Sequence, residues 1–157
     1  MAKPAAEQHA VLNDLDNLNV ASLSPLLAPA GLRRQLPLGD GDGAAIAQAR
    51  ETVARIIAGD DPRFLVVVGP CSIHDVDAAQ DYLARLTALR DELASELLIV
   101  MRVYFEKPRT TVGWKGLVND PHLDDSFDIE TGLRMARELL LALAESSMPA
   151  ATEALDP

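Results

Sequence analysis

Positive charge gathers in one short segment of an otherwise acidic chain. Residues 101–116 read MRVYFEKPRTTVGWKG, with four basic side chains against a single acid, Glu106, for a net charge of +3. The whole chain has 157 residues and a net charge of −10 at pH 7. Guanidinium groups match the geometry of phosphate oxygens, and glycine amides can approach an anion closely. The contrast therefore favours a phosphate site that uses Arg102, Lys107, Arg109, Lys115, the hydroxyls of Thr110 and Thr111, and the amides of Gly113 and Gly116.

Arg102 requires a partner more than the other basic residues do, because it lies inside an apolar run where an unpaired guanidinium would be costly to bury. It needs either a bound anion or a carboxylate partner, and Glu153 is one candidate for that partner. A solvated basic loop with one Arg–Glu pair in the core would explain the same residues. Spacing alone leaves both interpretations open.

The only cysteine, Cys71, follows an apolar run in the stretch VVVGPCSIHD. A lone cysteine is most often a small, inert buried side chain. A thiolate that binds a metal is the sharper alternative, with His74 as a second donor, and a nucleophilic thiol is a third. One Cys and one His do not define a metal site, so the residues leave this question open.

The elements that must position these residues alternate along the chain. Apolar runs predict strands at 63–69, 97–105 and 149–155, and helical periodicity predicts helices at 77–96 and 129–146. Such β-α-β-α-β order is typical of a parallel sheet with right-handed crossovers, whose ligands bind at the carboxyl ends of the strands. Both Cys71 and the basic segment fall at such ends.

Capping residues and apolar faces make the helix predictions more specific. Asp42 and Gly59 bound a helix at 43–59, and Asp128 precedes the helix at 129–146. The expected buried positions of the first are Ile46, Ala49, Val53, Ile56 and Ile57. Those of the second are Ile129, Leu133, Ala136, Leu140 and Leu143. Residues 1–42 are predicted to form an arm with a short helix within 29–37, and residues 43–157 the first part of a catalytic domain.

Composition excludes several classes of protein. The chain is 48% hydrophobic and 24% charged, as in one globular domain, and no apolar run is long enough to span a bilayer. A single cysteine permits no intrachain disulfide, so we expect a cytoplasmic protein. The net negative charge argues against nucleic acid or an anionic membrane as the main partner.

Two long motifs carry a resemblance to a known family. GPCSIHD at 69–75, together with MRVYFEKPRTTVGWKGL at 101–117, is similar to the class I, microbial 3-deoxy-D-arabino-heptulosonate 7-phosphate (DAHP) synthases, and the similarity covers roughly residues 25–157. The resemblance implies a (β/α)₈ barrel that condenses phosphoenolpyruvate with D-erythrose 4-phosphate to give DAHP and phosphate. This reaction is the first step of the shikimate route to chorismate and the aromatic amino acids. Since such a barrel usually needs about 250 residues, we expect the chain to be truncated after about three barrel strands.

The resemblance also implies roles for individual residues. Cys71 would bind the catalytic divalent metal (Mn²⁺, Fe²⁺, Co²⁺ or Zn²⁺), and His74 would lie outside the ligand set. Lys107 would be the catalytic residue, between the two substrates. The remaining substrate-binding residues would be Arg102 for phosphoenolpyruvate, Arg109 and Thr110 for the phosphate of erythrose 4-phosphate, and Glu153 along the pocket.

Some properties of the family reach beyond this segment. Its other metal ligands come from later strands, so this chain carries one ligand of four. A homo-oligomer and feedback inhibition by an aromatic amino acid are expected of the complete enzyme. The alternative is an inactive remnant that binds phosphorylated ligands or pairs with a full-length subunit.

Overall fold

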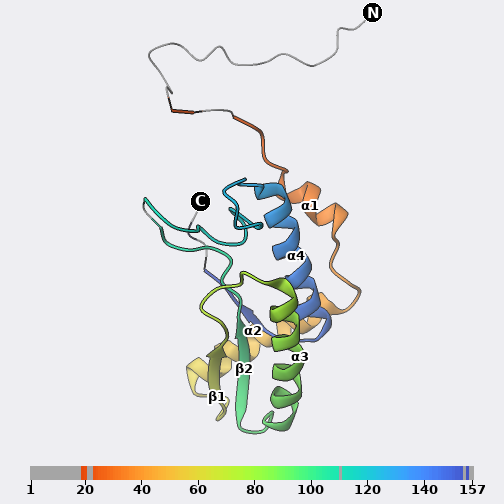
Figure 1. Ribbon diagram of the computed structural model, residues 1–157. Helices are drawn as coiled ribbons and strands as arrows, with labels where there is room; N and C mark the ends of the chain where they lie inside the picture. Colours follow the sequence, from red (N-terminus) through yellow and green to blue (C-terminus); the bar gives the residue numbers. More distant parts are fainter. Residues whose placement is uncertain (1–18, 21–22, 110, 154, 156–157) are drawn as a thin grey trace, which may run out of the picture.

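The computed structural model describes residues 19–20, 23–109, 111–153 and 155 and has an α/β fold (Figure 1). Its strands are β1 (Phe64–Val68), β2 (Leu97–Arg102) and β3 (Ala150–Ala151). Its helices are α1 (Pro29–Gln35), α2 (Asp42–Ala58), α3 (Val76–Glu92) and α4 (Ile129–Glu145). The strands form one parallel sheet in the order β1-β2-β3, which confirms the predicted alternation.

The sheet is shorter at its carboxyl edge than the apolar runs predict. Phe64 pairs with Leu97 at one end and Val68 with Met101 at the other. Beyond Val68 the chain turns through Gly69 and Pro70, so β2 is paired with β1 only as far as Met101. Its pairing with β3 continues to Arg102, where β2 ends, rather than to residue 105. β3 covers two of the seven residues expected of it.

One face of the sheet carries the core. Ile99 and Met101 of β2 pack with the buried side chains of α3 and α4, which lie beside β2 in Figure 1. Asp75 and Asp128 cap these two helices by accepting backbone N–H bonds from Ala78 (2.9 Å) and Thr131 (3.2 Å). The Asp128 cap confirms the sequence prediction.

The buried stripe of α4 differs from the predicted one. Ala136 and Leu143 are buried as expected, but Leu139 is fully buried while Leu140 is only half-buried. α4 contacts both α2 and α3, so its inner surface is wider than one periodic stripe. Leu139 belongs to the core and Leu140 also lines a groove next to α2.

Helix α2 departs from two expectations. Gly41, in a left-handed conformation (φ 95°), is the N-cap, whereas Asp42 is the first helical residue and accepts a hydrogen bond from Gly39 N at 3.1 Å. No residue of α2 is buried, and Ile57 is 74% exposed. Ile46, Ala49 and Val53 instead line a groove of about 540 Å³ that also touches β1 and β2. In Figure 1, α2 crosses behind the sheet.

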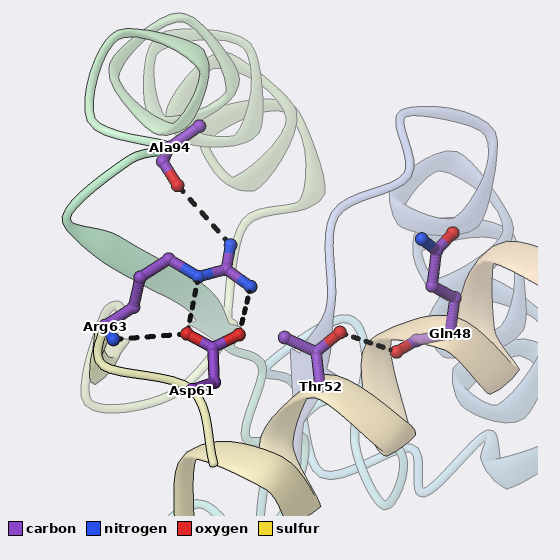
Figure 2. Close-up of polar contacts among 5 residues, drawn as sticks. All are labelled: Gln48, Thr52, Asp61, Arg63 and Ala94. Carbon is purple, nitrogen blue, oxygen red and sulfur yellow. Dashed lines mark hydrogen bonds and ion pairs between the residues drawn. The ribbon is translucent and has the colours of Figure 1, made fainter. Parts of the chain in front are cut away.

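A forked ion pair fixes the turn between α2 and β1 (Figure 2). Arg63 donates from Nη2 to Asp61 Oδ2 at 2.8 Å and from Nε to Oδ1 at 3.0 Å. Its Nη1 reaches the carbonyl of Ala94 at 3.4 Å, in the turn before β2. The hydrogen bonds from Arg63 lower the pKa of Asp61 to about 2. The pair therefore ties together the turns that lead into two neighbouring strands.

The end of the predicted N-terminal arm, at Gln35 and Leu36, lies against α4. Arg137 donates from Nε and Nη2 to the carbonyl of Leu36, both at 3.2 Å, and Arg134 donates to Gln35 Oε1 at 2.6 Å. The division into an arm, 1–42, and a catalytic part, 43–157, stays a prediction. Within the described ranges, no helix is both long and apolar enough to cross a membrane.

Candidate active site

The turn after β1 brings Cys71 to the carboxyl end of the sheet. A Cβ atom at Gly69 would overlap the backbone carbonyl of Arg102, so only glycine allows the ends of β1 and β2 to lie this close. Pro70 then ends the strand, and the thiol of Cys71 is exposed. The exposed thiol is inconsistent with the first alternative considered for Cys71, an inert buried side chain.

Lys107 meets Cys71 across 36 residues of sequence. Its Nζ lies 3.0 Å from Cys71 Sγ and donates a hydrogen bond to it. This hydrogen bond, and next the charge of Lys107, lower the pKa of the Cys71 thiol, and Arg102 adds to the effect. The neighbourhood therefore favours a thiolate, the form that binds metals and attacks electrophiles.

Arg102 lies beside the same turn. Its Nε donates to the carbonyl of Pro70 at 3.0 Å, and its Cζ stands 4.7 Å from the centroid of the Tyr104 ring. Tyr104 follows Arg102 at i+2, just beyond the end of β2. No ion pair joins Arg102 to Glu153 in the described part of the chain. The guanidinium is held by a backbone carbonyl and an aromatic ring instead of the carboxylate considered from the sequence.

Residues 106–109 and 111–116, called the basic loop below, fold back on one another. Lys107 N donates to the carbonyl of Lys115 at 2.8 Å, and Glu106 forms an antiparallel bridge with Gly116. Gly116 has φ 115°, and a Cβ there would overlap the carbonyl of Phe105. The indole of Trp114 donates to the carbonyl of Asp120 at 2.7 Å. These bonds give the loop a defined shape from which Lys107 reaches Cys71.

The other predicted residues occupy different places around this point. Arg109 is exposed on the basic loop, where its Nε lies 3.3 Å from the position that a Cβ of Gly113 would take. Glu153 follows β3 and is half-buried. Thr110 lies outside the described residues. The structure therefore brings Cys71, Lys107 and Arg102 together, with Arg109 and Glu153 on adjoining segments.

One polar contact at this edge was not anticipated. Glu106 Oε2 accepts a hydrogen bond from the backbone N–H of Leu155 at 3.0 Å. The signal in the sequence is the isolated acid inside a basic segment, and its charge alone does not indicate a backbone donor 49 residues away.

The donors available to a metal ion are few. Within the described ranges, no group of three or more His, Cys, Asp or Glu side chains could hold one. His74 is exposed and joins no such group. Cys71 thus offers one suitable donor at this edge.

Comparison with known proteins decides the family. The model of the DAHP synthetase I family matches residues 43–157. The chain belongs to the DAHP synthetase I family. The Phe-sensitive phospho-2-dehydro-3-deoxyheptonate aldolase of Escherichia coli K12 is 55% identical over 141 residues, which are 90% of this chain and 40% of that enzyme. The phospho-2-dehydro-3-deoxyheptonate aldolase of Amycolatopsis methanolica is 50% identical over 143 residues, 91% of this chain and 70% of that protein.

Solved structures of DAHP synthetase I relatives agree with the fold. The phospho-2-dehydro-3-deoxyheptonate aldolase of Francisella tularensis superposes with a TM-score of 0.84 at 46% identity, over 88% of this chain and 40% of that one. The three parallel strands therefore correspond to the N-terminal part of a DAHP synthase, as the resemblance implied. The chain spans about 40% of the length of the E. coli relative.

Proposed function

We propose that this chain supplies the part of a DAHP synthase active site that holds phosphoenolpyruvate and erythrose 4-phosphate. The observation that carries the proposal is the meeting of Lys107, Cys71 and Arg102 at the carboxyl ends of β1 and β2. Parallel α/β folds bind their ligands at this edge. Two cationic groups suited to an anion and one thiol suited to a metal thus lie together at the carboxyl ends of the strands.

The chemistry of the condensation explains why these residue types would be needed. C3 of phosphoenolpyruvate forms a bond to the aldehyde carbon of erythrose 4-phosphate, so negative charge develops on the aldehyde oxygen, which takes up a proton. Water adds to C2 of phosphoenolpyruvate, and phosphate leaves from that carbon. An ammonium group such as Lys107, held between the substrates, stabilises that charge. Both substrates carry phosphate groups, and Arg102 and Arg109 would offset their mutual repulsion while holding them in a reactive arrangement.

A divalent cation, implied by the family, fits these residues in part. The exposed Cys71 thiol, whose pKa Lys107 lowers, has the chemistry of a metal ligand. A catalytic metal site usually has three or more protein ligands, so the others would have to come from outside the described residues. When bound, the cation would act as a Lewis acid on the aldehyde oxygen.

A chimera tests the proposed function in a complete barrel. The aligned 141-residue region of the E. coli Phe-sensitive enzyme would be replaced by that of this chain. We expect the chimera to form DAHP and the Cys71→Ala variant to lose both activity and bound metal. A chimera that folds and binds metal but makes no DAHP would contradict the proposal and favour the inactive remnant considered from the sequence.

Substitutions in the chimera separate the two substrates. Arg102→Ala should raise KM for phosphoenolpyruvate, and Arg109→Ala should raise KM for erythrose 4-phosphate. The loss of a charge-assisted contact, about 1.5–3 kcal/mol, corresponds to about ten- to a hundredfold in KM. Arg85→Ala, which removes an exposed arginine on α3 that pairs with Asp81, is the matched control. Equal effects of both arginine variants on both substrates would contradict the separate roles.

The partners of the complete enzyme are proposed on the same grounds. Relatives named Phe-sensitive, Tyr-sensitive and Trp-sensitive all match this chain. We therefore infer regulation by an aromatic amino acid; the cytoplasmic homo-oligomer expected from the resemblance stays a prediction. Phenylalanine inhibition would be measured for the E. coli Phe-sensitive enzyme and for the chimera. A difference between the two would show that this segment takes part in sensing.

A further inference from the structure

Glu106 is the only acid in the basic segment, and the proposed function gives it no task. We propose that Glu106 is a positioning residue: its carboxylate ties the basic loop to the segment after β3, and so fixes Lys107 relative to Glu153. The significance of these two residues rests on the proposed function. The tie itself rests only on the contacts described below.

The side chain of Glu106 spans two distant parts of the sequence. Its Oε2 accepts the backbone N–H of Leu155 at 3.0 Å, across 49 residues. Glu106 is bridged to Gly116, so the backbone here is extended and neighbouring side chains point to opposite sides. Lys107 accordingly turns to Cys71 while Glu106 turns to the chain beyond β3.

A role in balancing the charge of the loop does not account for this geometry. Such an acid would form an ion pair with a basic neighbour, yet the described residues show no ion pair of Glu106. It is instead directed at a backbone donor. A carboxylate bound to a backbone N–H makes a stronger hydrogen bond than a neutral acceptor does.

The tie comes where the sheet no longer holds the two segments together. The pairing of β2 with β3 ends at Arg102 and Ala151, and Val103 N donates to the carbonyl of Ala151 at 2.8 Å. Past this point, the bond from Leu155 to Glu106 is the only hydrogen bond between residues 104–116 and 152–155 among those described. Lys107 and Glu153, on either side of this opening, therefore depend on Glu106 for their separation.

Amide hydrogen exchange of the 157-residue chain tests the tie directly. In Glu106→Ala, the Leu155 amide should exchange about ten- to a hundredfold faster, the effect of losing one hydrogen bond to a charged acceptor. Glu106→Gln keeps an acceptor oxygen and should retain most of the protection. Glu138→Ala, an exposed acid on α4, is the matched control. Unchanged exchange at Leu155 in Glu106→Ala would overturn the proposal.

The fluorescence of Trp114 measures the positioning effect separately. Trp114 is the only tryptophan in the chain and lies on the basic loop, so its exposure to a quencher reports how firmly the loop is held. Glu106→Ala should raise the acrylamide quenching constant of Trp114, and Glu106→Gln should restore it. Leu155→Pro, which removes the donor, should have the same effect as Glu106→Ala, and the double variant should show no further rise. Additive effects, or an unchanged constant in Glu106→Ala, would overturn the positioning role. Neither measurement needs substrate, so an inactive chimera would leave both results standing.

Discussion

At the scale of single residues, the contact between Lys107 and Cys71 lowers the pKa of the thiol and fixes where the ammonium group lies. A thiol that accepts a hydrogen bond from an ammonium group loses its proton more readily. The same ammonium group is held against the end of β1 instead of extending into solvent. The contact therefore favours the thiolate form of Cys71 and holds the side chain of Lys107 at the end of β1.

The thiol provides a prediction in the chain without substrate or metal. Because Lys107 is the largest cause of the lowered pKa, Lys107→Met should move the pKa of Cys71 back up toward its ordinary value. Alkylation by iodoacetamide near neutral pH, in the presence of a chelator, should then be severalfold slower. Lys115→Met is the control, and equal rates for wild type and Lys107→Met would contradict the assignment.

The sequence predicted which residue types gather at this site, but not which atoms they contact. The excess of basic residues in 101–116 and the demand of Arg102 for a partner both follow from charge and burial, and both point to this edge. The partners themselves are a backbone carbonyl, Pro70 O, and an aromatic face, Tyr104. Every residue has a carbonyl, so the sequence does not mark which one a guanidinium will use.

At the scale of elements, two kinds of link hold the helices and strands in register. The apolar side of β2 packs on α3 and α4. Arg63 and Asp61 join the turn before β1 to the turn before β2. The periodic patterns predicted the order of the elements because that order depends on local sequence. They did not predict how far α4 turns toward α2, because that depends on two neighbours at once.

Helix α4 distinguishes the observed packing from the predicted stripe. Leu139→Ala should lower the free energy of unfolding by about 2–5 kcal/mol, since it empties a fully buried site. Leu140→Ala, adjacent but half-buried, should cost about 1 kcal/mol. Urea unfolding of both variants measures the difference. A larger loss for Leu140→Ala would mean that the periodic stripe had been correct.

The Asp61–Arg63 pair predicts how stability depends on pH. Folding lowers the pKa of Asp61 from 3.8 to about 2, so its contribution is fully present above about pH 4. That contribution is lost as the pH falls through about 2. Asp61→Asn should therefore be less stable than wild type at pH 6, and the difference should shrink between pH 4 and pH 2. Thermal unfolding across this range measures it, and a constant difference would contradict the ion pair in Figure 2.

At the scale of the whole molecule, the proposed function makes this chain one side of an active site. Its described residues hold no group of three or more metal donors, and they place an exposed thiol beside basic side chains at the edge of a three-stranded sheet. A catalytic metal usually has at least three protein ligands. The 157-residue chain assayed alone with Mn²⁺ and both substrates should therefore make no detectable DAHP, whereas the chimera should. Turnover by the isolated chain would show that one donor suffices.

The close approach at Gly69 limits how this sequence can vary. Gly69 lacks a positive φ, so its backbone shape would suit any residue, yet a single added carbon would strike the carbonyl of Arg102. Gly59 is the opposite case, with φ 83° and open space around its Cβ position. In a saturation library, position 59 should accept asparagine, which tolerates left-handed backbone. Position 69 should accept no substitution that leaves Cys71 and Arg102 side by side, so directed evolution of this edge would have to begin elsewhere.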